Sequence, residues 1–326
     1  MTSLTTEFFA GLQAMNSLEI LRLRTLPEEM LFEDQGAHSV ELASCQVVDL
    51  EGDERTVAKI LEVLRLPSNI HLRVHASFRE LSVPAPSPSI IRAIRALLDA
   101  RGHDTAGYRS AVFEHCCEHL NGHKMFFPGY LKSCWRLRAY RCSSLNKETV
   151  SDLNSDNAPD LDVCLKWTTH ELQARESSTE HGEFFGLASA VSSIQELHLV
   201  SPPDGSVLYT PNVLRHHFKS WTSVERLRIT GAEFARRALD ELNSSPGQSL
   251  LFPSLTELAL RDILAAQRLG SGGNHDAVDL GKDLVTMVRA RHEAGASIQR
   301  LEMSGNETLD PDTVEELKTF TTLRSC

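Results

Sequence analysis

Leu255-Thr256-Glu257-Leu258-Ala259-Leu260 is the stretch of sequence that decides the fold. It reads apolar-x-x-Leu-x-apolar, and the alternation at its end is typical of a β-strand with one buried face. The same pattern recurs at residues 18–23, 194–199, 224–229 and 298–303. Each copy after the first follows a stretch that can form a helix. Because one strand and one helix cannot bury their apolar faces alone, such units must stack on one another.

Stacked strand–helix units of this kind form an α/β leucine-rich-repeat solenoid, with a curved parallel sheet on the concave side and helices on the convex side. We expect a single array over residues 1–326, made irregular by polar insertions around residues 100–185. A helix is expected over residues 108–120. Further strands are expected at residues 46–51, 70–74, 135–140 and 161–167. The array begins inside a repeat, so we expect an N-terminal cap to be missing.

Three parts of the chain carry a resemblance to a known family: residues 15–23, residues 56–74 and residues 288–303. They resemble the leucine-rich-repeat half of the F-box-like proteins that are expanded in mushroom-forming (basidiomycete) fungi. The resemblance implies an adaptor whose N-terminal F-box docks on a ubiquitin-ligase scaffold while its repeats bind the substrate. The sequence contains no F-box pattern, so we expect attachment to that scaffold only if an F-box lies upstream.

Charge and cysteine content limit the class of protein. A net charge of −11 argues against a nucleic-acid partner, because such binding needs an excess of Lys and Arg. The seven cysteines are irregularly spaced and include no Cys-x-x-Cys pair, which indicates a reduced, intracellular protein of the cytoplasm or nucleus. The sequence shows no secretory signal and no apolar run of about 18 residues, so no membrane partner is expected.

The motif His115-Cys116-Cys117-Glu118-His119 matches H-x-x-E-H, the inverted zincin pattern. On a helix, His115 and His119 share one face and can hold zinc, with Glu118 as the general base. A third ligand is then needed, for which Glu196 is one candidate. With fourteen histidines in the chain, a chance match on an amphipathic helix is the simpler interpretation. We therefore predict no enzyme, metal or cofactor, and keep a zinc hydrolase as the remote alternative.

The positions that alternate with the inward leucines lie on the open, concave face of the sheet. They are richer in Arg and His than the acidic chain as a whole would suggest. The predicted partner-binding residues are Arg22, Arg24, His71, Arg73, Arg136, Arg138, Tyr140, Lys166, His198, Arg228 and Arg261. Arg and Tyr are favoured in interfaces, and an acidic or phosphorylated protein segment suits such a surface. The alternative is that these are ordinary solvated strand positions.

The sequence thus predicts a protein–protein interaction module that binds its partner through the concave face. One role is the substrate-recognition part of an F-box-like ubiquitin-ligase adaptor. The other is a stand-alone leucine-rich-repeat scaffold without linkage to a ligase.

Overall fold

A computed structural model gives the fold of the chain. It describes residues 4–26, 39–77, 88–100, 107–119, 130–141, 159–170, 187, 191, 193–200, 213–243, 249–261, 280–304 and 309–325. The chain divides into two compact units. Unit 1 comprises Met1–Tyr108, Cys117–Arg141 and Lys147–Val191, and unit 2 comprises Arg109–Cys116, Cys142–Asn146 and Ser192–Cys326. None of the described helices has the length and apolar composition needed to cross a membrane.

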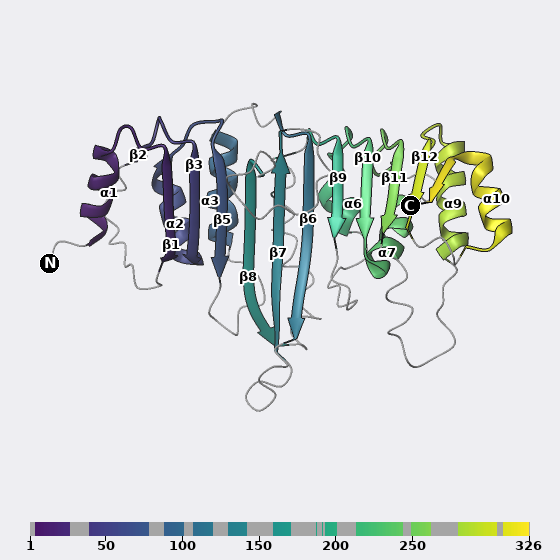
Figure 1. Cartoon of the computed structure of the whole chain (residues 1–326), viewed down its shortest axis with the longest axis horizontal. Coiled ribbons are helices and arrows are strands. Elements are labelled where there is room, and N and C mark those ends of the chain that lie inside the picture. Colours follow the sequence, from purple (N-terminus) through teal and green to yellow (C-terminus); the bar gives the residue numbers. More distant parts are fainter. Residues whose placement is uncertain are drawn as a thin grey trace. The chain divides into compact units, whose positions relative to one another are not determined.

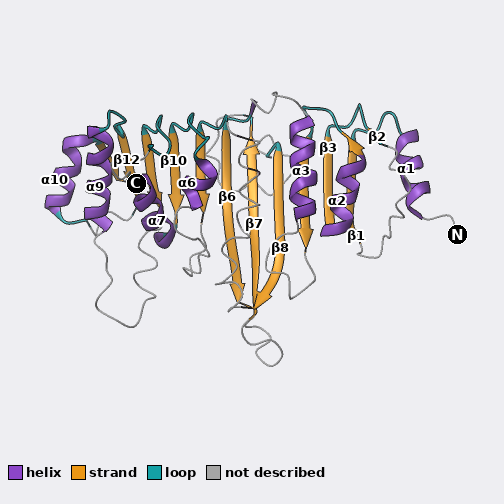
Figure 2. Ribbon diagram, turned by 180° about the vertical axis from the view of Figure 1, so that it is seen from behind, coloured by secondary structure: helices purple, strands orange, loops and turns teal. Residues whose placement is uncertain are grey.

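Unit 1 is a mostly parallel sheet with helices on one face. Its strands lie in the order β1 (Ile20–Leu26), β3 (Val47–Asp53), β5 (His71–Ser77), β8 (Leu161–His170) and β7 (Tyr130–Tyr140). The first four are parallel neighbours, and β7 runs antiparallel to β8. Its helices are α1 (Leu4–Ala14), α2 (Glu54–Val63) and α3 (Pro88–Ala100), and a separate short pair joins β2 (Val40–Glu41) to β4 (Leu64–Arg65). Figure 2 shows α2 and α3 covering one face of the strands.

The core of unit 1 forms where the apolar face of α2 meets the sheet. Val57 and Ile60 of α2 are fully buried, as are Val48 and Leu50 of β3. Asp53 starts the helix, because its side chain accepts hydrogen bonds from the first-turn backbone N–H groups. Burial of each large apolar side chain of this kind stabilises the fold by about 1.5–3 kcal/mol. The same strands therefore turn one face to the helices and leave the other, the open face, to polar side chains.

Unit 2 is a parallel sheet in its described part. Its strands lie in the order β6 (Ser110–His119, of which residues up to 116 belong to this unit), β9 (Glu196–Val200), β10 (Arg226–Thr230), β11 (Glu257–Arg261), β12 (Arg300–Met303) and β13 (Thr322–Ser325). All neighbouring pairs are parallel. The helices are α6 (Val213–Phe218), α7 (Ala232–Leu242), α9 (Leu280–Glu293) and α10 (Pro311–Phe320). Figure 1 shows the strands side by side.

The repeated leucines of unit 2 stand in register, as the recurring pattern requires. Leu197 pairs with Leu227, Leu227 with Leu258, and Leu258 with Leu301. All four side chains are buried. The row continues into β13, where Leu301 pairs with Leu323. Neighbouring copies therefore cover each other's apolar side chains, and the prediction of an α/β fold with a mostly parallel sheet is confirmed.

Three expectations differ from the structure. The helix expected over residues 108–120 is wrong: this stretch forms β6, whose Phe113 packs edge-on against Phe218 with ring centroids 5.2 Å apart. The expected all-parallel order is broken by the antiparallel β7. Neither unit's sheet curls, so the predicted concave and convex sides are not seen within the units. The single array over residues 1–326 stays a prediction, and most of the residues expected as polar insertions lie outside the described part of the chain.

Candidate functional site

Alternating charges cross the open face of unit 1 in one row. The strand register places Arg22 beside Asp49, Asp49 beside Arg73, Arg73 beside Asp162, and Asp162 beside Arg138. We call these five residues the unit 1 charge ladder. Every charge in the row has opposite charges as its neighbours, and such cross-strand pairs are stabilising. The ladder occurs because acidic and basic residues occupy the outward positions of consecutive strands in the sheet.

Asp49 joins the first three strands of the ladder. Its side chain is only 1% exposed, although it lies on the face opposite the helices. Arg24 donates to it from Nη2 over 2.9 Å, and the Nε atom of Arg73 lies 3.8 Å from its other carboxylate oxygen. A buried carboxylate needs such partners, since an unpaired charge away from water is costly. Asp49 therefore fixes the side chains of two predicted binding residues.

Asp162 is the second acidic centre, and it accepts shorter hydrogen bonds than Asp49 does. Arg136 donates to both of its oxygens, from Nε over 2.8 Å and from Nη2 over 2.7 Å, in the two-pronged geometry that gives strong, directional pairs. The Nε2 atom of His75 and the Nε atom of Arg73 lie 3.6 and 3.9 Å from Oδ2. Burial raises the pKa of the Asp162 carboxyl, but the hydrogen bonds from Arg136 and the nearby imidazole outweigh it and leave the pKa well below its usual range. Asp162 is therefore a fixed negative charge.

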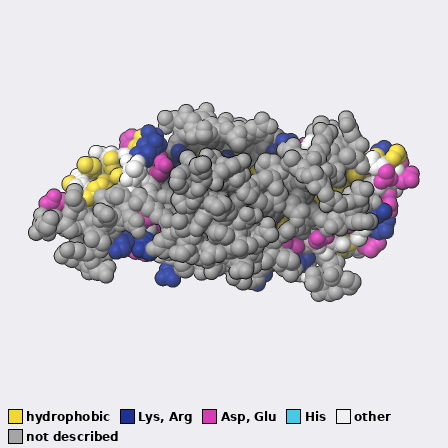
Figure 3. Space-filling model, turned by 90° about the horizontal axis from the view of Figure 1, so that it is seen from below, with side chains coloured by type: hydrophobic (Ala, Val, Ile, Leu, Met, Phe, Trp, Pro, Cys, Tyr) yellow, Lys and Arg dark blue, Asp and Glu magenta, His cyan; other side chains and the backbone are white. Residues whose placement is uncertain are grey.

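A cavity of about 300 Å³ opens next to this cluster, at the carboxyl ends of the parallel strands. It is lined by Thr25, Leu26, Glu51, Gly52, Asp53, His75, Ala76, Ser77 and Lys166. Glu51 and Lys166 bring opposite charges to its wall. Loops and side chains beyond the carboxyl ends of parallel strands are a common place for ligands in open α/β sheets. Figure 3 views the molecule from below. Among the side chains that it shows in colour, acidic and basic ones are interspersed.

The backbone around the cavity is tightly packed. Gly52 stands where any side chain would meet β1, since a Cβ atom there would lie 2.5 Å from the Cβ of Leu26. Thr25 adopts a positive φ of 57°, and the strand pairing between β1 and β3 shifts register at this point. Ser77 closes the rim by donating from Oγ to the carbonyl of Gly52 over 3.2 Å. The rim is thus shaped by β1, β3 and β5 together.

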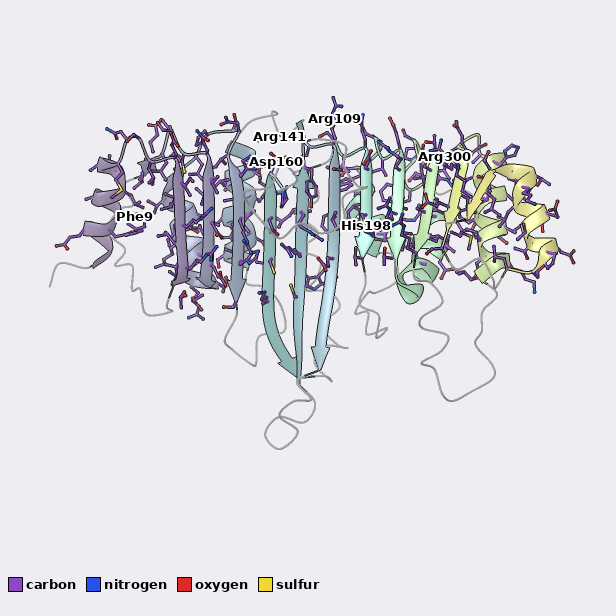
Figure 4. All side chains as sticks on the ribbon, in the orientation of Figure 1. Phe9, Arg109, Arg141, Asp160, His198 and Arg300 are labelled. Atoms are coloured by element: carbon purple, nitrogen blue, oxygen red, sulfur yellow. The ribbon has the colours of Figure 1, made fainter. Side chains whose placement is uncertain are left out.

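Two of the predicted binding residues lie at the opposite end of these strands. His71 begins β5, with its Nδ1 atom 3.6 Å from Asp160, and Tyr140 ends the antiparallel β7. Figure 4 shows Asp160 there together with Arg141, which donates to the carbonyls of residues 68 and 69 and so ties β7 to the chain before β5. This cluster holds strand ends together and is separate from the cavity.

Three predicted binding residues belong to unit 2. His198 lies on β9 (Figure 4), with its Nε2 atom 2.9 Å from the hydroxyl of Thr230. Arg228 stands beside it on β10. Arg261 donates to Glu302 over 3.2 Å at a partly exposed position. Unit 2 therefore presents these residues on its own open face.

The sequence predicted the cations of the site but not their ion pairs with buried carboxylates. Arg24, Arg73, Arg136 and Lys166 come together around the cluster and the cavity, and Arg22 and Arg138 complete the ladder. Asp162 was not predicted. The signal for Asp162 was present, because the buried alternation over residues 161–167 puts Asp162 on the same face as Lys166. The role of these residues in binding stays a prediction.

The structure does not form the helix on which the zinc-site alternative was placed. His115 and His119 lie on strand β6, where residues four apart are separated by about 13 Å along the chain. On a helix the same spacing is about 6 Å, which is what the metal motif requires. The suggested third ligand, Glu196, forms an ion pair with Arg226.

Comparison of the chain with protein-family models, curated proteins and solved structures finds no match.

Proposed function

We propose that this chain is a non-enzymatic protein-binding module of leucine-rich-repeat type, and that it binds its partner on the open face of unit 1. The observation that carries this proposal is the cavity at the carboxyl ends of β1, β3 and β5, which begins two residues beyond the charge ladder on β3 and β5. The in-register leucines of unit 2 support the repeat arrangement. The irregular spacing of the seven cysteines, with no Cys-x-x-Cys pair, supports a reducing location, in the cytoplasm or nucleus.

The partner that fits this face best is an acidic or phosphorylated protein segment. Arg24 is held in place by Asp49, and its side chain is still 55% exposed. Lys166 lines the cavity from β8. A cation that is already oriented loses less side-chain entropy on binding, so it recognises a carboxylate or phosphate more tightly. The buried carboxylates Asp49 and Asp162 therefore serve to orient the arginines.

A peptide panel tests this proposal. Acidic, phosphorylated, neutral and basic peptides of one length are titrated against the chain, and binding is followed by fluorescence anisotropy. The acidic and phosphorylated peptides should bind most tightly, with affinity that falls as salt is added. Equal binding of all four classes, or preference for the basic class, would overturn the partner class.

Charge reversal then locates the binding surface. Arg24→Glu combined with Lys166→Glu should weaken binding of the best peptide by about tenfold or more, which corresponds to about 1.4 kcal/mol. Arg300→Glu is the matched control, since Arg300 is a half-exposed arginine on unit 2 paired with Glu257 over 2.6 Å. The control should bind within about twofold of the unaltered chain. If the control loses as much as the double variant, the unit 1 assignment is wrong.

The narrower role that we propose is substrate recognition in an F-box-like ubiquitin-ligase adaptor. It is supported by the resemblance of residues 15–23, 56–74 and 288–303 to that family. A stand-alone scaffold without linkage to a ligase is the rival. Affinity purification of the protein from its own cells distinguishes the two: cullin-type scaffold subunits should co-purify with an adaptor, and their consistent absence would favour the scaffold.

A further inference from the structure

Two cysteines meet on the open face of unit 1. Cys134 of β7 and Cys164 of β8 have their sulfur atoms 3.2 Å apart. The antiparallel register pairs Cys134 with Lys166 and Arg136 with Cys164, so the cysteines are diagonal neighbours across the strand pair. Because side chains alternate between faces, residues at these register positions point to the same side of the sheet. The sulfur atoms therefore meet because of strand pairing and not by chance approach of loops.

The surroundings of Cys164 favour its thiolate. The hydrogen bond from the thiol of Cys134 lowers the pKa of Cys164 most; burial opposes this, and the positive charges of Lys166 and Arg136 lower the pKa further. Cys45 is the contrasting case within the same unit. It is fully buried, and burial raises the pKa of its thiol. Of Cys45 and Cys164, Cys164 is therefore the residue whose surroundings favour the reactive thiolate.

A small oxidant has a route to this pair. Cys134 is half-buried, while Cys164 is 3% exposed. His75, the register partner of Cys164 on β5, lines the cavity, and so does Lys166, two residues further along β8. Two neighbours of Cys164 therefore line the cavity, and the partly exposed side chain of Cys134 is where a small peroxide meets the pair.

We propose that Cys134 and Cys164 are a redox modification site that forms a reversible disulfide in the presence of a peroxide. The thiolate of Cys164 attacks one peroxide oxygen; the O–O bond breaks, and the leaving oxygen departs as water or alcohol after taking up a proton. The resulting sulfenic acid is attacked by the sulfur of Cys134. The S–S bond forms, the hydroxyl of the sulfenic acid leaves as water with the proton of Cys134, and the peroxide has been reduced by two electrons.

The bond formed here should be easily reduced. Diagonal neighbours on antiparallel strands are separated by about 7–8 Å between Cα atoms, which is at or beyond the usual span of a disulfide. The strands must therefore shift to close the bond. Exposed or strained disulfides of this kind are the labile ones that thiol reductants open readily.

Peptide mapping of the native, full-length chain tests the proposal without any variant. The chain is treated with equimolar hydrogen peroxide, denatured in an alkylating reagent and digested with trypsin without reduction. Trypsin isolates each thiol, because residues 133–136 contain Cys134 as their only cysteine and residues 148–166 contain only Cys164. We expect these two peptides joined with the loss of two hydrogen atoms, and their separation after dithiothreitol treatment. Cys45, in residues 25–55, serves as the internal control and should be recovered alkylated.

Two results would overturn the proposal. One is recovery of Cys134 and Cys164 as separate alkylated peptides while other cysteines of the chain have oxidised. The other is pairing of either residue with Cys45 or another cysteine at equal or greater yield. The Cys134→Ser variant adds an independent arm: without its partner, Cys164 should be trapped as sulfenic acid by dimedone, at a higher yield than in the unaltered chain. This inference does not depend on the identity of any binding partner.

Discussion

Unit 1 and unit 2 each carry a row of alternating charges on the open face, and the two rows differ in depth. In unit 2 the register aligns Glu196, Arg226, Glu257 and Arg300 at the first position of four strands. There Glu196 is buried, but the side chains of Arg226 and Arg300 are 44% and 41% exposed, and that of Glu257, the acidic residue between them, is 34% exposed. In unit 1 both acidic members of the ladder, Asp49 and Asp162, are buried.

The exposure of the charged side chains determines how much each row contributes to the stability of the fold. Exposed ion pairs contribute about 0–1 kcal/mol, because water solvates the separated charges nearly as well. A buried charge that loses its partner leaves the other charge uncompensated, which is far more costly. We therefore interpret the unit 2 row as an aid to strand register, and the unit 1 ladder as a rigid framework that holds the cations beside the cavity.

The largest effect is expected from removing the centre of the deeper row. Asp162→Ala should lower the free energy of unfolding by about 3–5 kcal/mol, because Arg136 is left without its buried partner. Glu257→Ala, in the shallower row, should cost about 0–1 kcal/mol. Urea denaturation followed by circular dichroism measures both. Equal losses from the two substitutions would break the distinction between the units.

A smaller effect is expected at the rim of the cavity. Gly52→Ala should lower the free energy of unfolding by about 1–3 kcal/mol, because the new methyl group collides with Leu26 and forces β1 away from β3. Gly11→Ala is the control: it lies on α1, and a Cβ atom there meets nothing within 4 Å. That substitution should stabilise the helix by up to about 1 kcal/mol. An unchanged free energy of unfolding for Gly52→Ala would contradict the tight packing of β1 against β3 at the rim.

The prediction with the most definite sign is the pH dependence of the contribution that Asp162 makes to stability. Its pKa is lowered in the folded state, so its contribution to stability is complete above the unfolded value of about 3.9 and is lost as pH falls towards the folded value. The difference in free energy of unfolding between the unaltered chain and Asp162→Asn should therefore be constant near neutral pH and shrink below about pH 4. A difference that grows in acid would contradict the ionised, paired carboxylate.

Much of the fold was readable from sequence because it depends on local patterns. The strand pattern around Leu258 is a short-range signal, and the strand lies where it was expected. The stretch around Phe113 failed because a short apolar run fits a helix or a strand equally well, and pairing with β9 decided the outcome. The antiparallel placement of β7 likewise depends on contacts that the pattern does not encode.

The site was less predictable for the same reason. Outward cations such as Arg24 and Arg136 follow from alternation within one strand. Their partners follow from the register between strands: Arg136 meets Asp162, which is 26 positions away, only because β7 and β8 pair as they do. The contact between Cys134 and Cys164 depends on that same pairing. Composition suggested an Arg-rich surface, whereas the structure shows that buried carboxylates pair with several of these arginines.

Hydrogen–deuterium exchange of the chain with and without the best-binding acidic peptide tests the central claim most directly. Binding at the cavity should slow amide exchange at residues 51–53, 75–77 and 164–166, and leave the strand ends of β10, β11 and β12 unchanged. Slowed exchange confined to the strands of unit 2, with the unit 1 residues unaffected, would contradict the account.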